Sequence, residues 1–176
     1  MKKFKEFLIE QQSKPMYSVY LNDTVADMSH PVHRAADAIH KAWMSRNPKQ
    51  DWNAAQHVDY RDLPQEEQGK DIEHVRTVED LIHTIPVPEG GYAKDHREAV
   101  ANAFGSIQHE NWRKSFDPEG TGKERRKKVK SGGEADGMVN INVPWTELHP
   151  EWKQENYDAG LAAFDAHRTH VGSSQY

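Results

Sequence analysis

Two histidine and tryptophan pairs with the same spacing are the residues best suited to bind a ligand. His40 precedes Trp43 by three positions, and His109 precedes Trp112 by the same three positions. Side chains three residues apart lie on the same face of a helix. An indole stacks on a nucleobase for about 1 to 3 kcal/mol, and a nearby imidazole can hydrogen-bond the same ligand. The pattern indicates a site for a planar ligand, and its recurrence favours a site built between the two pairs.

The recurrence extends to other parts of the chain. Segment 38–43 is similar to 107–112 at an offset of 69 residues. Segment 58–63 is similar to 143–148 at an offset of 85 residues, which matches Tyr60 with Trp145. Because two stretches recur in the same order, the sequence predicts an internal duplication.

Length and composition restrict the class of protein. The chain has 176 residues, of which 35% are hydrophobic and 29% charged, so it can bury one modest core or two small ones. Its apolar runs are too short for a bilayer and no secretory signal precedes them, so we expect a cytoplasmic protein with no membrane partner. The absence of cysteine excludes disulfides and thiolate chemistry. The net charge of -5 argues against nucleic acid as a general partner.

Helix and turn signals predict an α+β, mainly helical fold with two pseudosymmetric repeats, each of two helices with short extended segments. Ser29 as a cap and Asn47-Pro48 as a stop bound the first helix, and a second runs from Pro64 to about Ile85. The second copy is expected to have helices over 96–115 and 151–167. Extended segments are expected at 57–60 and 138–143. The predicted parts are an N-terminal extension (1–28), repeat 1 (29–86), a linker (87–95), repeat 2 (96–167) and a C-terminal tail (168–176).

A basic segment enlarges the second copy. Six of the eight residues from Lys123 to Lys130 are lysine or arginine. Flanking glycines predict a loop over 117–137, for which a solvated loop, a lid over phosphates and a salt-sensitive nucleic-acid contact all stay open. Residues 120–123 lack the Walker spacing, so we reject a nucleoside triphosphatase.

These motifs resemble the ryanodine-receptor repeat domain, which occurs in tandem pairs in calcium-release channels and in shorter prokaryotic and phage proteins. The resemblance covers roughly residues 30 to 167 and rests on Ile39-His40-Lys41-Ala42-Trp43, Trp52, Val58 to Pro64 and Glu66 to Asp71. The second copy departs from the pattern, with an extra residue between Ile107 and His109 and with His149 in place of the proline.

The resemblance implies an adenine-type or signalling nucleotide held between the repeats, with Trp43 and Trp112 stacking on the purine. His40 and His109 would hydrogen-bond its base, ribose or phosphate. Cationic side chains would neutralise phosphate, namely Arg46, Arg113, Lys123, Arg125 and Arg126. The sequence predicts no catalytic residue, metal ligand or cofactor, because it holds no metalloprotease or serine-hydrolase motif.

The leading hypothesis is therefore non-enzymatic binding that sequesters a nucleotide, which in a phage would remove a defence signal. One alternative is a protein-interaction module that uses the same face and the basic loop. Another is a nucleotide-processing enzyme with His40 or His109 as general acid or base. Aromatic residues away from the pairs, namely Trp52, Tyr60, Trp145 and Trp152, are predicted to be packing residues. A tryptophan beside alanine and isoleucine is itself commonly a core residue, and a histidine beside it a structural donor.

Overall fold

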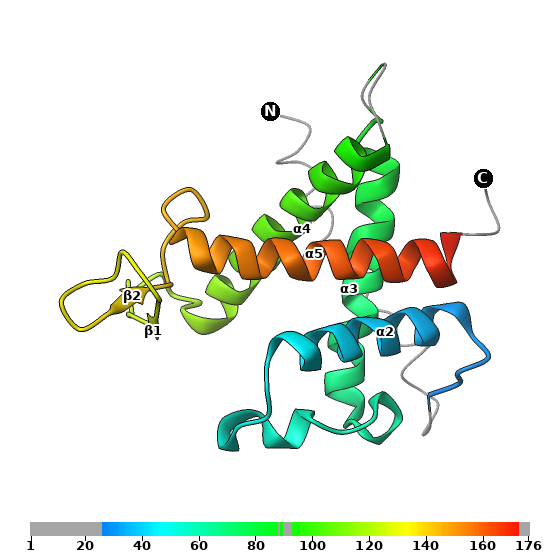
Figure 1. Ribbon diagram of the computed structural model, residues 1–176, viewed down its shortest axis with the longest axis horizontal. Helices are drawn as coiled ribbons and strands as arrows, with labels where there is room; N and C mark the ends of the chain where they lie inside the picture. The colour runs from blue at the N-terminus through cyan, green and yellow to red at the C-terminus, as the bar shows by residue number, and fades with distance from the viewer. Residues whose placement is uncertain (1–25, 88, 90–92, 173–176) are drawn as a thin grey trace.

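Four α-helices form most of the described structure, a computed structural model that describes residues 26–87, 89 and 93–172 (Figure 1). The elements in chain order are α2 (Pro31–Arg46), the 3-10 helices η1 (Asp51–Gln56) and η2 (Tyr60–Asp62), α3 (Gln65–Thr84), α4 (Ala93–Phe116), β1 (Arg126–Lys128), β2 (Met138–Asn140) and α5 (Pro150–His170). This confirms the mainly helical α+β class. Most of the predicted N-terminal extension and residues 173–176 lie outside the described residues.

Helices α2 and α5 begin in the same way. Pro31 and Pro150 occupy the first helical turn, where a missing N–H group leaves no hydrogen bond unmade. The residue before each proline caps the helix, because His30 Nδ1 accepts from the N–H of Val32 and His149 Nδ1 accepts from that of Glu151, both at 3.3 Å. The cap of α2 is thus His30, and the prediction of Ser29 was wrong.

The extended segments differ from the prediction. Residues 60–62 form a 3-10 turn capped by Asp59, whose Oδ1 accepts from the N–H of Arg61 at 3.1 Å. The predicted strand at 138–143 keeps strand geometry over 138–140 alone. It pairs antiparallel with 126–128, so the prediction that all of 117–137 is a loop was wrong. The pairing brings Arg126 within 2.9 Å of Glu134 and 3.0 Å of Asp136, and these ion pairs stabilise a strand of poor intrinsic propensity.

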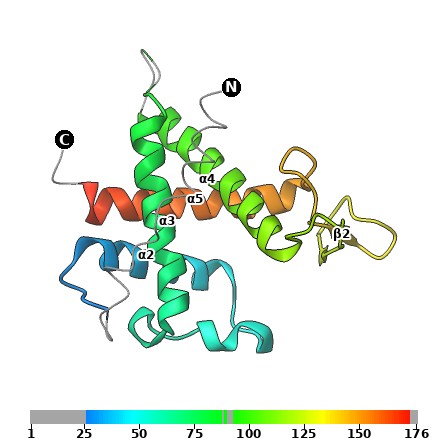
Figure 2. The same cartoon turned by 180° about the vertical axis from the view of Figure 1, so that it is seen from behind.

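The helices of the two predicted repeats pack on each other. Helix α2 packs on α5, α3 packs on α4, and α3 also crosses α5 (Figures 1 and 2). The buried core is continuous across these contacts and includes Val75 from α3, Phe104 from α4 and Phe164 from α5. Among the described helices, none has the length and apolarity that a bilayer crossing requires.

Candidate functional site

His40 and His109 bind the main chain of their own repeat. His40 Nε2 lies 3.0 Å from the carbonyl oxygen of Val58, and His109 Nε2 lies 2.8 Å from that of Val143. Because a carbonyl oxygen only accepts, Nε2 carries the proton and donates in both histidines. Each side chain is 4% exposed and ties the segment after the first helix to that helix. The hydrogen bond to the main chain therefore engages one nitrogen of each imidazole.

The aromatic contacts around these histidines also match. His40 stacks on Trp43 at 6.0 Å between ring centroids, and His109 stacks on Trp112 at 5.9 Å. His40 lies 6.5 Å from Tyr60 at 53°, and His109 lies 6.0 Å from Trp145 at 52°. The residues that the offsets of 69 and 85 equate in sequence thus make equivalent contacts in space.

The two tryptophans have different surroundings beyond this point. Trp112 also stacks on Phe116 at 5.2 Å and 13°, one turn further along α4. The position equivalent to Phe116 is Asn47, whose amide donates to the carbonyl oxygen of Trp43 at 3.0 Å. Trp112 therefore has stacked rings in both directions along its helix, whereas the second ring beside Trp43, that of His57 at 5.5 Å, is tilted by 48°.

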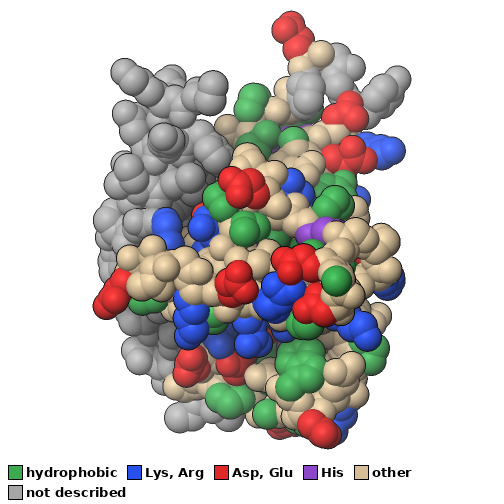
Figure 3. Space-filling view, turned by 90° about the vertical axis from the view of Figure 1, so that its left-hand side faces the viewer, with side chains coloured by type: hydrophobic (Ala, Val, Ile, Leu, Met, Phe, Trp, Pro, Cys, Tyr) green, Lys and Arg blue, Asp and Glu red, His purple; other side chains and the backbone are tan. Residues whose placement is uncertain are grey.

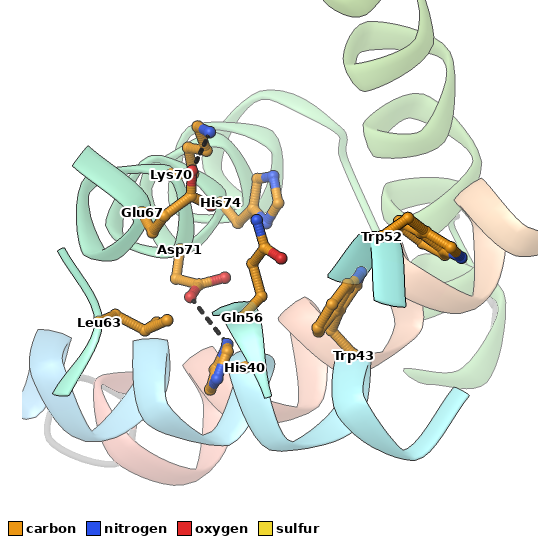
Figure 4. A pocket seen from close by; sticks show the side chains of 9 residues that line it. All are labelled: His40, Trp43, Trp52, Gln56, Leu63, Glu67, Lys70, Asp71 and His74. Atoms are coloured by element: carbon orange, nitrogen blue, oxygen red, sulfur yellow. Dashed lines mark hydrogen bonds and ion pairs between the residues drawn. The ribbon is translucent and has the colours of Figure 1, made fainter. Parts of the chain in front are cut away.

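A cavity of about 240 Å³ lies between α2, η1 and α3, within the predicted first repeat (Figure 4). Trp43 and Trp52 flank one side of it, the side chains of His40 and Asp71 point toward each other, and the Gln56 amide extends toward His74. Its lining consists of His40, Trp43, Trp52, Gln56, Leu63, Glu67, Lys70, Asp71 and His74. Trp112 is not in this lining, so this cavity is not the expected site between the two tryptophans.

Burial shifts the pKa values of Asp71 and His74, two groups that line the cavity, toward their neutral forms. Burial, reinforced by Glu67, raises the pKa of Asp71 to about 8. Burial lowers the pKa of His74 to about 4. Asp71 Oδ2 lies 3.6 Å from His40 Nδ1, the nitrogen that has no proton in the neutral ring because Nε2 donates to Val58. The Asp71 carboxyl and the His40 imidazole therefore face each other just beyond hydrogen-bond distance.

Gln56 adds a hydrogen-bonding group without a partner. Its Oε1 atom is buried and makes no hydrogen bond within the part of the chain that the structure describes. Most buried polar atoms in proteins are paired, and leaving an acceptor unpaired costs about 1 to 3 kcal/mol. The cavity thus combines indole surfaces with neutral donors and acceptors, one of which is unsatisfied.

Asp71→Asn is expected to raise stability more near pH 9 than near pH 5. The raised pKa of about 8 means that the folded state binds a proton which the unfolded state releases above its ordinary value of 3.8. The stability from this proton is fully present below that ordinary value and is lost as pH rises through about 8. An amide fits such a position, because Asn156 is its equivalent in repeat 2 and donates to the carbonyl oxygen of Trp152 at 2.8 Å.

Thermal unfolding at the two pH values measures this effect. We expect the gain near pH 9 to exceed that near pH 5 by at least about 1 kcal/mol. Asp62→Asn, at an exposed position, is the matched control and should change stability equally at both pH values. Equal changes for Asp71→Asn would show that this carboxyl is ionised throughout the range.

The arginines predicted to bind phosphate are engaged by other groups. Arg46 Nε lies 3.5 Å from Glu155 Oε1, an ion pair in which the buried Nε makes no hydrogen bond among the described residues. Arg113 donates to Glu110 at 2.8 Å and to Asn142 at 3.3 Å. Arg126 is held by the acidic residues of its own hairpin. None of these arginines lines the cavity.

The basic hairpin touches the cavity through Lys127. Lys127 Nζ lies 5.6 Å from the ring centroid of Trp52 and 5.8 Å from that of Trp152, within range of cation–π attraction. Lys123 lies 4.9 Å above Phe116, and Arg125 is exposed. On this face of the molecule basic and acidic side chains are interspersed (Figure 3). Lys127 of the hairpin therefore contacts Trp52 without lining the cavity. The basic side chains of the hairpin do not form a single phosphate site.

Sequence reasoning found His40 and Trp43 but missed the residues that complete the cavity. Trp52 was predicted to be a packing residue, yet 66% of its surface is exposed. Gln56 belongs to none of the motifs recognised in the sequence. Lys70 and Asp71 belong to the segment that carried the family resemblance, which was the one available signal for them.

No protein-family model, curated protein or solved structure matches this chain. Its function is therefore inferred from the cavity.

Proposed function

We propose that the protein binds a small planar ligand of the nucleobase class in the cavity between α2, η1 and α3 and does not convert it chemically. This keeps the adenine-type ligand expected from the sequence and moves its site from the space between the repeats into repeat 1. Binding without conversion lowers the concentration of unbound ligand, which is sequestration. In a phage, such binding would remove a signal that contains a nucleobase.

The dimensions and walls of the cavity support a base-sized ligand. A volume of about 240 Å³ is below the range of roughly 300 to 1,000 Å³ that is usual for drug-sized ligands. Trp43 and Trp52 offer indole surfaces, and stacking of a base on such a surface is worth about 1 to 3 kcal/mol. A nucleobase edge carries both donors and acceptors, as do the protonated Asp71 and the Gln56 amide.

The unpaired Gln56 Oε1 atom is the observation that carries this proposal. An exocyclic amine, such as that of adenine, would donate to it and remove the cost of a buried acceptor without a partner. A charged ligand group is not needed for this contact.

Gln56→Leu is expected to weaken the binding of adenosine at least about tenfold, which corresponds to 1.4 kcal/mol. The variant should fold as well as the wild type, because an apolar side chain of similar size replaces an unsatisfied polar one. Calorimetric titration of adenosine into both proteins measures the difference. Gln154→Leu, on the exposed surface of α5, is the matched control and should bind like the wild type. Equal affinity in the Gln56 variant, or no binding of adenosine or adenine by the wild type, would refute the proposal.

A further inference from the structure

We propose that the groove between α3 and α4 receives the substituent of the bound base, and that this substituent is uncharged or cationic and carries no phosphate. The inference rests on the proposed function. It specifies the class of ligand as a nucleoside or an amine-bearing nucleoside.

The groove adjoins the base cavity. It has a volume of about 690 Å³ and lies between the first half of α3 and the second half of α4. Lys70 and His74 line both the groove and the base cavity. A substituent on a base held in the cavity against Trp43 and Trp52 can therefore extend past Lys70 and His74 into the groove.

Acidic side chains dominate the charge of the groove. Glu66 and Glu73 line it, and Glu67 lies beside it in the base cavity. Among the described residues that line the groove, Lys70 is the one lysine, and its amine is 2.5 Å from Glu67 Oε1. The lowered pKa of His74 keeps that ring neutral. The positive charge of Arg46 contributes to the lowered pKa of His74. Arg46 also forms an ion pair with Glu155, whose Oε1 lies 3.5 Å from its Nε.

A phosphate would meet an unfavourable field in this groove. Burial is the main cause of the raised pKa of Glu73, and the negative charge of Asp80 adds to it, so this carboxylate already lies in the field of another acidic group. A phosphate monoester adds about 1.5 to 2 negative charges at neutral pH. An ammonium group would instead be attracted to Glu66 and Glu73.

The opposite wall of the groove suits sugar hydroxyls. Asn111 and Ser115 line it from α4 and offer amide and hydroxyl groups that both donate and accept, and the Gln108 side chain beside them hydrogen-bonds His74. Gly69 lines the α3 side, so one position there presents no side chain.

The charge of the substituent is tested by calorimetric titration with adenine, adenosine, adenosine 5′-monophosphate and 5′-amino-5′-deoxyadenosine at low salt. We expect the amine to bind most tightly and the monophosphate at least about tenfold more weakly than adenosine. Equal or tighter binding of the monophosphate would overturn this inference while leaving the proposed function intact. Failure of all four probes, including adenine, would overturn the proposed function itself.

Two variants test the place of the substituent. Replacing Glu66 and Glu73 with glutamine should strengthen the binding of the monophosphate relative to that of adenosine at least about fivefold. Gly69→Met should fill the groove while favouring the helix by up to about 1 kcal/mol, so loss of folding is not expected. We expect this substitution to weaken the binding of adenosine about tenfold and to leave the binding of adenine unchanged. If Gly69→Met leaves the affinity for adenosine unchanged, or if the double variant leaves the affinity for the monophosphate unchanged relative to that for adenosine, the substituent lies elsewhere.

Discussion

Trp43→Ala is expected to weaken adenosine binding by about 5- to 150-fold, whereas Trp112→Ala should change it by no more than about twofold. Trp43 lines the base cavity and loses a stacking surface on truncation. Trp112 stacks on His109 and Phe116 within its own helix and lies outside the cavity lining. Calorimetric titration of both variants measures the contrast.

The two tryptophan variants also control for each other. Each removes an indole that stacks on a histidine of its own repeat, so both are expected to lose stability. Affinities are therefore compared at a temperature at which both variants remain folded. Equal losses of affinity would restore the shared site between the repeats that the sequence suggested, and no loss in either would return both tryptophans to packing roles.

Gly160→Ala is expected to lower the free energy of unfolding by about 2 to 3 kcal/mol. Helix α5 passes α4 so closely at this point that a Cβ atom on residue 160 would lie 2.6 Å from the carbonyl oxygen of Ala101 and 2.8 Å from its Cα. Both are backbone atoms, which cannot rotate away as the end of a side chain can. The helices must then separate, and this separation also loosens Val100 and Phe164 in the core.

Urea unfolding measures this change from the transition midpoint. Gly69→Ala is the control, because it lies in the interior of α3 and is expected to raise stability by up to about 1 kcal/mol through helix propensity. A Gly160→Ala variant as stable as the wild type would show that α4 and α5 do not approach as closely as described.

Local signals in the sequence were enough to predict much of the fold. Proline at the start of α2 and Asn47 at its end are recognised from the chain itself, and so is the alternation that marked the strand at 138–140. The offsets of 69 and 85 residues also led to the correct equivalence of the His40 and His109 contacts. These features depend on residues close in sequence or on a pattern repeated within it.

The missed features depend on contacts between distant residues. Strand β1 is an Arg-Lys-Lys segment with little strand propensity, and its pairing relies on acidic partners 8 and 10 positions later. Whether Trp43 or Trp112 meets a cavity depends on the residue four positions later, which is Asn47 in one case and a stacked Phe116 in the other. The neutral state of Asp71 likewise results from burial by packing.

The base site within repeat 1 is tested most directly by a two-dimensional NMR titration of the indole N–H signals with adenosine. The chain has five tryptophans, and single substitutions assign their signals. We expect the signals of Trp43 and Trp52 to shift in a saturable manner, through ring currents of a stacked base, while that of Trp112 stays in place. A shift of Trp112 together with Trp43, or the absence of any shift at saturating adenosine, would contradict a base site within repeat 1.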